Sequence, residues 1–230
     1  MLPYALFFLL IVCLICLIIS DYCKRYYFRF FFKTSCSILF MLIALSSYYI
    51  SCKNTLYFIL MITAFAFCFI GDVLLAVNKT YDNSCDNSCD KYFIYGGTSF
   101  GIAHIYFSAA FIYFIGLFYR DFFVAAILSL SLILFLKFSK KYSFKGMYLM
   151  VCSYCILISF MVAKAISFVK LYSIIPRQST LTITGALLFL FSDCVLSLIV
   201  FGKKEPPKCL TAVNLITYYI GQSLLALSLM

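Results

Sequence analysis

The chain has 230 residues, of which 65% are apolar and only 11% are charged, and its formal net charge is +10. A soluble globular domain carries about 25% charged residues, because its surface must face water. The composition therefore excludes an ordinary soluble domain, and it favours a single transmembrane domain over residues 1–230.

The apolar residues occur in long blocks, close to the roughly 20 residues that a helix needs to cross a bilayer. We predict an all-α fold, a polytopic transmembrane bundle of eight helices. In chain order the predicted spans are Leu2–Ser20, Thr34–Ile50, Leu56–Val77, Ile94–Phe118, Phe122–Leu136, Met147–Val169, Leu181–Phe201 and Leu210–Leu229. The separation of the fourth block from the fifth rests only on the charged residues Arg120 and Asp121, so seven spans is the alternative count. The first block has no basic segment before it, so we expect a retained helix and not a signal peptide.

Basic residues are distributed unevenly between the two sets of loops. The loops on one side hold 13 of the 18 Lys and Arg residues, and the loops on the other side hold 4. The richer side comprises residues 21–33, 78–93, 137–146 and 202–209. Because cytoplasmic loops are enriched in Lys and Arg, we predict that this side is cytoplasmic and that both termini are not. In a eukaryotic host we expect the endoplasmic reticulum membrane.

This asymmetry accounts for the net charge, so no nucleic-acid partner is expected, and the basic side favours contact with anionic membrane lipids. The loop and cysteine patterns likewise predict no metal, cofactor or disulfide framework. Residues Asp82–Asp90 repeat Asp-Asn-Ser-Cys, which is typical of a solvated loop of low complexity. Cys85 and Cys89 lack the spacing of a zinc site, and most of the 12 cysteines lie inside apolar blocks.

Three ionisable residues lie deep inside predicted spans, where an unpaired charge is costly and therefore points to function. At a rise of about 1.5 Å per residue, Asp72, His104 and Asp193 lie roughly 8, 15 and 12 Å from the predicted cytoplasmic side. Lys164 also lies within a span, but it is close to the outer end. We predict that its long side chain reaches the interface there.

The fourth and eighth blocks each align polar and small residues on one helix face. These residues are Gly97, Gly101, His104 and Ser108 in one block, and Asn214, Tyr218, Gly221 and Gln222 in the other. The Gly-x-x-x-Gly start of the first set predicts close approach of another helix backbone. We therefore predict one cavity that Asp72 and Asp193 both face, with His104 and Tyr218 in its wall.

Two segments of the chain resemble each other. Residues 67–76 read Phe-Cys-Phe-Ile-Gly-Asp-Val-Leu-Leu-Ala, and residues 188–197 read Leu-Phe-Leu-Phe-Ser-Asp-Cys-Val-Leu-Ser. A small residue precedes the Asp in both segments, and the two segments are four spans apart. This pattern predicts two parallel four-helix repeats, each of which contributes one Asp.

Four motifs follow one another in the chain: Phe69–Leu75 (FIGDVLL), Phe100–Tyr106 (FGIAHIY), Gly185–Leu196 (GALLFLFSDCVL) and Thr217–Gln222 (TYYIGQ). In order, spacing and eight-span plan they resemble the YhhN-like lysoplasmalogenase family, from about the second span to the C-terminus. Two features depart from that family. The acidic Asp82–Asp90 segment lengthens a loop that is expected to be short, and Lys33-Thr34 stands where the family tends to have Lys-Pro.

The resemblance implies a membrane-embedded ether hydrolase whose substrate is a single-chain ether phospholipid. It would cleave the vinyl-ether bond of a lysoplasmalogen to a fatty aldehyde and glycerophosphoethanolamine or glycerophosphocholine. Asp72 and Asp193 would be the catalytic residues. The residues that bind or orient the substrate would be His104, Tyr106, Asn214, Tyr218 and Gln222.

The chemistry of a vinyl ether agrees with a pair of carboxyl groups. Protonation of its β-carbon leaves an oxocarbenium ion that water attacks, which needs a carboxylic acid and a carboxylate in one apolar site. Gly71 offers Asp72 no hydroxyl, whereas Ser192 adjoins Asp193. We therefore predict Asp72 as the acid and Asp193 as the base.

Two other classes of function stay open at this point. A proton-coupled transporter of small molecules or lipids is the alternative, because buried carboxyl groups also form proton relays. A non-catalytic membrane scaffold is the third, since a buried Asp, Asn or Tyr can serve only to hold helices together.

Overall fold

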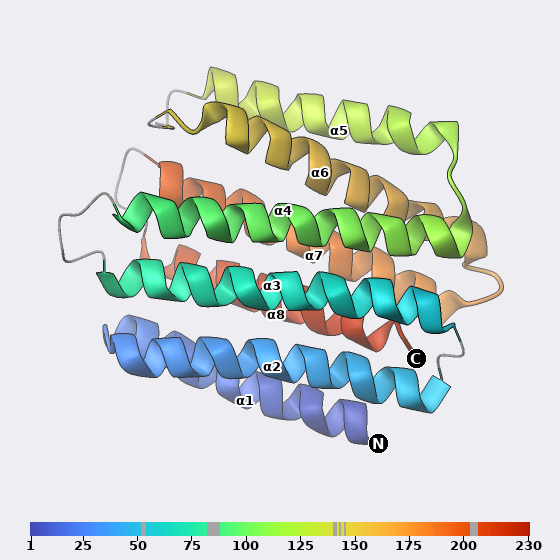
Figure 1. Ribbon diagram of the computed structural model, residues 1–230, viewed down its shortest axis with the longest axis horizontal. Helices are drawn as coiled ribbons and strands as arrows, with labels where there is room; N and C mark the ends of the chain where they lie inside the picture. The colour runs from blue at the N-terminus through green and yellow to red at the C-terminus, as the bar shows by residue number, and fades with distance from the viewer. Residues whose placement is uncertain (52–53, 82–87, 140–141, 143, 145, 203–206) are drawn as a thin grey trace.

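The computed structural model describes residues 1–51, 54–81, 88–139, 142, 144, 146–202 and 207–230. These residues form a bundle of eight helices that run side by side (Figure 1). The helices are α1 (Leu2–Tyr22), α2 (Tyr26–Ser51), α3 (Thr55–Tyr81), α4 (Ser88–Ile115), α5 (Tyr119–Phe138), α6 (Tyr148–Ile166), α7 (Pro176–Phe201) and α8 (Lys208–Leu227), with a 3₁₀ turn, η1 (Ser167–Leu171), after α6. Each of the eight is long and apolar enough to cross a membrane. The all-α fold and the eight spans are thus confirmed.

The alternative of seven spans is wrong, because the fourth and fifth blocks are separate helices. The chain leaves α4 at Gly116, whose φ of +79° is accessible to glycine at little cost. It enters α5 through Asp121, whose carboxylate accepts a hydrogen bond of 2.9 Å from the Phe118 backbone N–H.

The predictions for Asp82–Asp90 concern a segment that lies largely outside the described residues, because residues 82–87 are not among them.

The packing of the helices repeats after four elements. α1 to α4 form one row in which each helix packs against the next, and α5 to α8 form a second such row. The rows meet at two contacts, α2 against α8 and α4 against α6 (Figure 1). These two contacts are equivalent in the two halves, because α2 corresponds to α6 and α4 corresponds to α8. This arrangement is the one expected of two parallel four-helix repeats.

One asymmetry separates the two rows. α1 packs against α2 and also against α8, whereas the matching helix α5 packs extensively against α6 alone among the described residues. α5 is therefore held by fewer neighbours than α1 in the part of the chain that the structure describes.

The close approach of two helix backbones occurs between α7 and α8. A Cβ added at Gly185 would lie 2.9 Å from the Gly221 carbonyl oxygen, so only glycine fits at this crossing. The Gly-x-x-x-Gly prediction is therefore only partly right. Gly97 and Gly101 do face another helix, but their neighbours are side chains of α6 and not its backbone.

Lys164 does not reach the interface, so that prediction is wrong. Its side chain is fully buried, and its ammonium group lies 2.7 Å from the Asp121 carboxylate and 2.6 Å from the Gly116 carbonyl oxygen. The reason is that the α4–α5 turn presents a carboxylate and a helix-terminal carbonyl inside the bundle, where they replace water as partners of the cation. This buried ion pair ties the start of α5 to α6.

Candidate active site

The two deep carboxyl groups belong to two separate polar clusters. In the first, Asp72 on α3 is 2% exposed and lies 3.3 Å from the Lys33 ammonium nitrogen on α2. The hydroxyls of Ser37 and Tyr218 donate hydrogen bonds of 2.7 and 2.8 Å to the same carboxylate oxygen. A cation and two hydroxyl donors are the kind of partners that a buried carboxyl group needs, and they come from α2 and α8.

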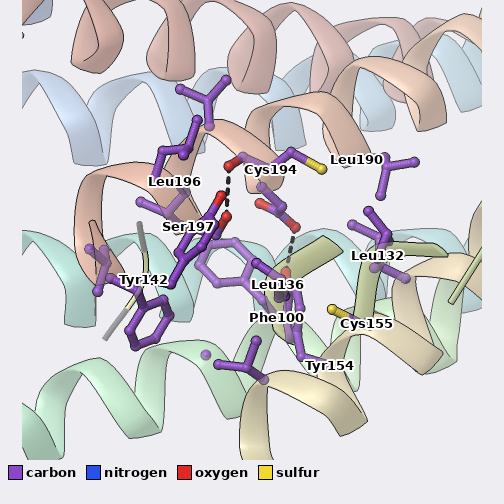
Figure 2. Close-up of a pocket in the computed structure, with 18 of the residues that line it drawn as sticks. Phe100, Leu132, Leu136, Tyr142, Tyr154, Cys155, Leu190, Cys194, Leu196 and Ser197 are labelled. Atoms are coloured by element: carbon purple, nitrogen blue, oxygen red, sulfur yellow. Dashed lines mark hydrogen bonds between the residues drawn. The ribbon is translucent and has the colours of Figure 1, made fainter. Parts of the chain in front are cut away.

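The second cluster surrounds Asp193 on α7. The Tyr154 hydroxyl on α6 donates a hydrogen bond of 2.5 Å to Asp193 Oδ2, drawn as the dashed line that ends at Tyr154 in Figure 2. The same hydroxyl lies 3.0 Å from Nε2 of His104 on α4. His104 is fully buried, whereas the Asp193 side chain is 14% exposed. Asp193 is therefore the carboxyl group that a molecule inside the bundle can touch.

A cavity of about 310 Å³ makes Asp193 accessible. It lies between α4, α5, α6 and α7, on the side where α5 stands away from the rest of the bundle. Its wall is almost wholly apolar and aromatic, and the labelled side chains in Figure 2 include Phe100, Leu132, Leu136, Tyr142, Cys155 and Leu190. Among the described residues, Asp193 is the only charged residue in this wall. The volume falls at the small end of the range for ligand sites, about 300–1,000 Å³.

The prediction that both carboxyl groups and the side chains of His104 and Tyr218 share one cavity is wrong, because only Asp193 of these four lines it. The physical reason is an aromatic ring beside Asp72. Gly71 has no side chain, and the Phe100 ring fills that space, 2.7 Å from where a Cβ would be. Phe100 in turn lines the cavity and packs edge to face against Tyr218, so it stands between the cavity and the Asp72 cluster.

The hydrogen bonding of the two Asp residues is the reverse of the prediction. Among the described residues the Ser192 hydroxyl makes no hydrogen bond to Asp193. It accepts one of 3.1 Å from the Asn214 amide, which also donates to the Ser192 carbonyl. Asp72 has the larger set of donors, since they come from α2 and α8 and not from its own helix. Asp72 is therefore the more fully enclosed carboxyl group of the two, with three polar partners.

The remaining predicted residues lie between helices, outside the cavity wall. Asn214 joins α8 to α7 through Ser192, as described above. The Gln222 side chain is fully buried, and its amide nitrogen lies 3.7 Å from the Cys68 sulfur on α3. Tyr106 stacks on Phe67 with ring centroids 5.7 Å apart. These contacts are of the kind that holds membrane helices together.

Sequence reasoning missed Lys33, Ser37 and Tyr154. By sequence Lys33 belongs to the basic loops, and Tyr154 is one of many Tyr residues in an apolar chain, so neither residue by itself indicates a functional site. A signal was nevertheless present in the repeat. Lys33 precedes Asp72 by 39 residues, and Tyr154 precedes Asp193 by the same 39, so the second helix of each half supplies the partner of that half's Asp.

A sequence model described as the YhhN family matches residues 28–229. The matched range includes both polar clusters and every helix that lines the cavity. Neither the curated proteins nor the solved structures contain a match to the chain.

Proposed function

This chain belongs to the YhhN family, and from that premise we propose that it is a membrane-embedded lysoplasmalogenase. The substrate would be a single-chain ether phospholipid with a vinyl-ether bond, and the products a fatty aldehyde and a glycerophosphoethanolamine or glycerophosphocholine. The observation that carries the proposal within the chain is the position of Asp193, whose carboxyl group is the only charged group among the described residues of an apolar cavity wall.

The shape and polarity of the cavity support an alkyl chain as its occupant. An apolar wall favours an uncharged chain, because burial of each CH₂ group contributes about 0.8 kcal/mol. The wall extends from Asp193 to Tyr142 and Phe201, at the end of the bundle where the basic loops lie.

We assign the proton transfer to Asp193. As a carboxylic acid it gives its proton to the β-carbon of the vinyl ether, which leaves an oxocarbenium ion beside the new carboxylate. That carboxylate stabilises the cation and takes a proton from the attacking water, so Asp193 regains its proton. The hemiacetal then separates into the aldehyde and the free glycerol hydroxyl. No net proton is consumed.

The contacts of Asp193 suit this role better than those of Asp72. The one hydrogen bond that the described residues give to Asp193, from Tyr154, goes to Oδ2, which leaves Oδ1 for the substrate. Asp72 is enclosed with Lys33 behind Phe100. We therefore propose that Asp72 supports the bundle and does not touch the substrate.

An aldehyde-release assay on the purified protein in detergent tests the proposal, with vinyl-ether and ester lysolipids compared side by side. We expect aldehyde from the vinyl-ether lipid only, with kcat lowered about 10²-fold or more in Asp193→Asn. Asp21→Asn, which removes a carboxylate paired with Arg29 at the α1–α2 turn, is the matched control and should keep its activity. A detergent solution holds no gradient, so an inactive wild-type protein would favour the transporter.

We also propose that the basic side faces the cytoplasm, on the strength of the distribution of Lys and Arg. Cys23 and Cys209 are exposed on that side. With the protein in the plasma membrane of bacterial cells, an impermeant maleimide should label them only after the cells are opened, whereas a cysteine introduced at the exposed Tyr172 on the other side should react at once. The opposite pattern would reverse the orientation.

A further inference from the structure

His104, Tyr154 and Asp193 form a chain of contacts that ends at the cavity. The Tyr154 hydroxyl is 3.0 Å from His104 Nε2 and 2.5 Å from Asp193 Oδ2. His104 Nε2 and Asp193 Oδ2 are 3.8 Å apart, which is too long for a direct hydrogen bond. The phenol hydroxyl is therefore the link between the imidazole and the carboxyl group.

The series His104–Tyr154–Asp193 can keep both of its hydrogen bonds in two opposite arrangements. In the first, His104 Nε2–H donates to Tyr154, and Tyr154 donates to the Asp193 carboxylate. In the second, protonated Asp193 donates to Tyr154, and Tyr154 donates to an unprotonated Nε2. A phenol has one proton and can also accept, and an imidazole nitrogen can do either, so no bond is lost in the change.

The surroundings of His104 fix its ring but leave its proton free to move. The ring packs against Phe189 and Tyr154, with centroid distances of 4.8 and 5.2 Å. Its second nitrogen, Nδ1, is buried and has no hydrogen-bond partner among the described residues. A partner on the second nitrogen is what usually fixes the tautomer of a functional histidine. Among the described residues no partner on Nδ1 sets the tautomer, so Nε2 can act as a donor or as an acceptor.

From these contacts we propose that Tyr154 and His104 are a proton relay to Asp193. A proton passes from Nε2 of the His104 imidazolium to Tyr154 Oη as the Tyr154 proton passes to Asp193 Oδ2. Neutral imidazole with its proton on Nδ1, neutral phenol and a carboxylic acid result, with no change in electrons. The reverse transfer returns the proton. The inference rests on the proposed function, in which Asp193 alternates between acid and carboxylate.

Other titratable groups near Asp193 come from three helices, and they cannot replace this route among the described residues. They are the thiols of Cys68, Cys155 and Cys194 on α3, α6 and α7. None of them has a hydrogen bond to the carboxyl group of Asp193 in the part of the chain that the structure describes.

The kinetic test removes only the hydroxyl of the link. Tyr154→Phe keeps the ring in the cavity wall and against His104, and we expect kcat to fall about 10- to 100-fold with a changed pH–rate profile. His104→Gln should cause a similar loss, and the double variant should lose no more than the larger single loss, because the two residues act as one unit. Tyr113→Phe, which removes an exposed phenol elsewhere on α4, is the matched control. Losses that multiply, or unchanged pH profiles, would overturn the relay.

A second measurement needs no substrate, because His104 is the only histidine in the chain. Protein labelled with ¹⁵N-histidine and purified without a histidine tag should give a single pair of imidazole nitrogen signals. We expect Asp193→Asn to move the Nε2 signal when Tyr154 is present and to leave it in place in Tyr154→Phe. An equal movement in both backgrounds, or none in either, would refute the relay. Absence of aldehyde release by the wild-type protein would instead refute the proposed function.

Discussion

Substitution of Asp72 by Asn separates support of the bundle from catalysis. The change keeps the size of the side chain and an oxygen that can accept hydrogen bonds from Ser37 and Tyr218. It removes the negative charge 3.3 Å from the Lys33 ammonium group, whose side chain is 7% exposed. The main consequence is therefore a buried cation without its carboxylate.

The magnitude follows from the two kinds of contact involved. Removal of one partner from a buried ion pair costs about 3–5 kcal/mol, because the other charge stays desolvated. The two hydroxyl contacts are retained in weaker form, and a hydrogen bond between membrane helices is worth only about 0.6 kcal/mol. We expect Asp72→Asn to lower the free energy of unfolding by about 3 kcal/mol. Asp193→Asn should cost about 1 kcal/mol, since it weakens one bond in a partly open cavity.

Thiol exposure during denaturant unfolding in detergent can measure both variants. Cys36 and Cys68 are fully buried, so a thiol-reactive dye reports the loss of the core. The double variant Lys33→Met/Asp72→Asn should recover part of the loss, because it removes the buried cation together with the carboxylate that pairs with it. An Asp72→Asn protein with wild-type stability and a large loss of kcat would refute this reasoning and place Asp72 in the chemistry.

Three further predictions concern other parts of the bundle. Lys164→Met should lower the free energy of unfolding by about 3–5 kcal/mol, because it leaves the Asp121 carboxylate buried without this cation. The double variant Lys164→Met/Asp121→Leu should recover much of that lost stability, and additive losses in it would contradict a buried pair. Gly185→Ala should lower the free energy of unfolding by about 1–3 kcal/mol, because its Cβ would meet the α8 backbone at 2.9 Å. Gly101→Ala, whose Cβ would have its nearest atom at 3.4 Å, should be tolerated in the same unfolding assay. Cys155→Phe should fill part of the cavity, and it should lower kcat/KM about 10-fold for substrates with long alkyl chains but less for substrates with short ones. An equal effect at all chain lengths would place the alkyl chain elsewhere.

Several features of this protein follow from its sequence alone. Apolar blocks of about 20 residues determine the spans, because a helix must satisfy its own backbone hydrogen bonds in lipid. Asp72, His104 and Asp193 stand out because ionisable residues are rare at that depth. The resemblance between residues 67–76 and 188–197 indicates the repeat. The four motifs indicate the YhhN family, and the family match over residues 28–229 confirms that assignment.

The partners of those residues could not be predicted in the same way. Lys33 lies near the start of a helix, where a basic residue is ordinary, and Tyr154 is a common residue of membrane helices. The position of Lys164 by itself predicts the interface, and in the sequence its partner Asp121 marks only a break between two spans. In each case the partner comes from another helix, and spacing along one helix contains no information about that.

Tertiary structure alone decided which carboxyl group can meet a substrate. The sequence places Asp72 and Asp193 at similar depths in matching repeats, so by sequence they are nearly equivalent. The Phe100 ring against Gly71 shields one of them, and the separation of α5 from the rest of the bundle opens a cavity beside the other. Depth is set by position along a helix, but access depends on the rotation of each helix and on side chains packed from its neighbours.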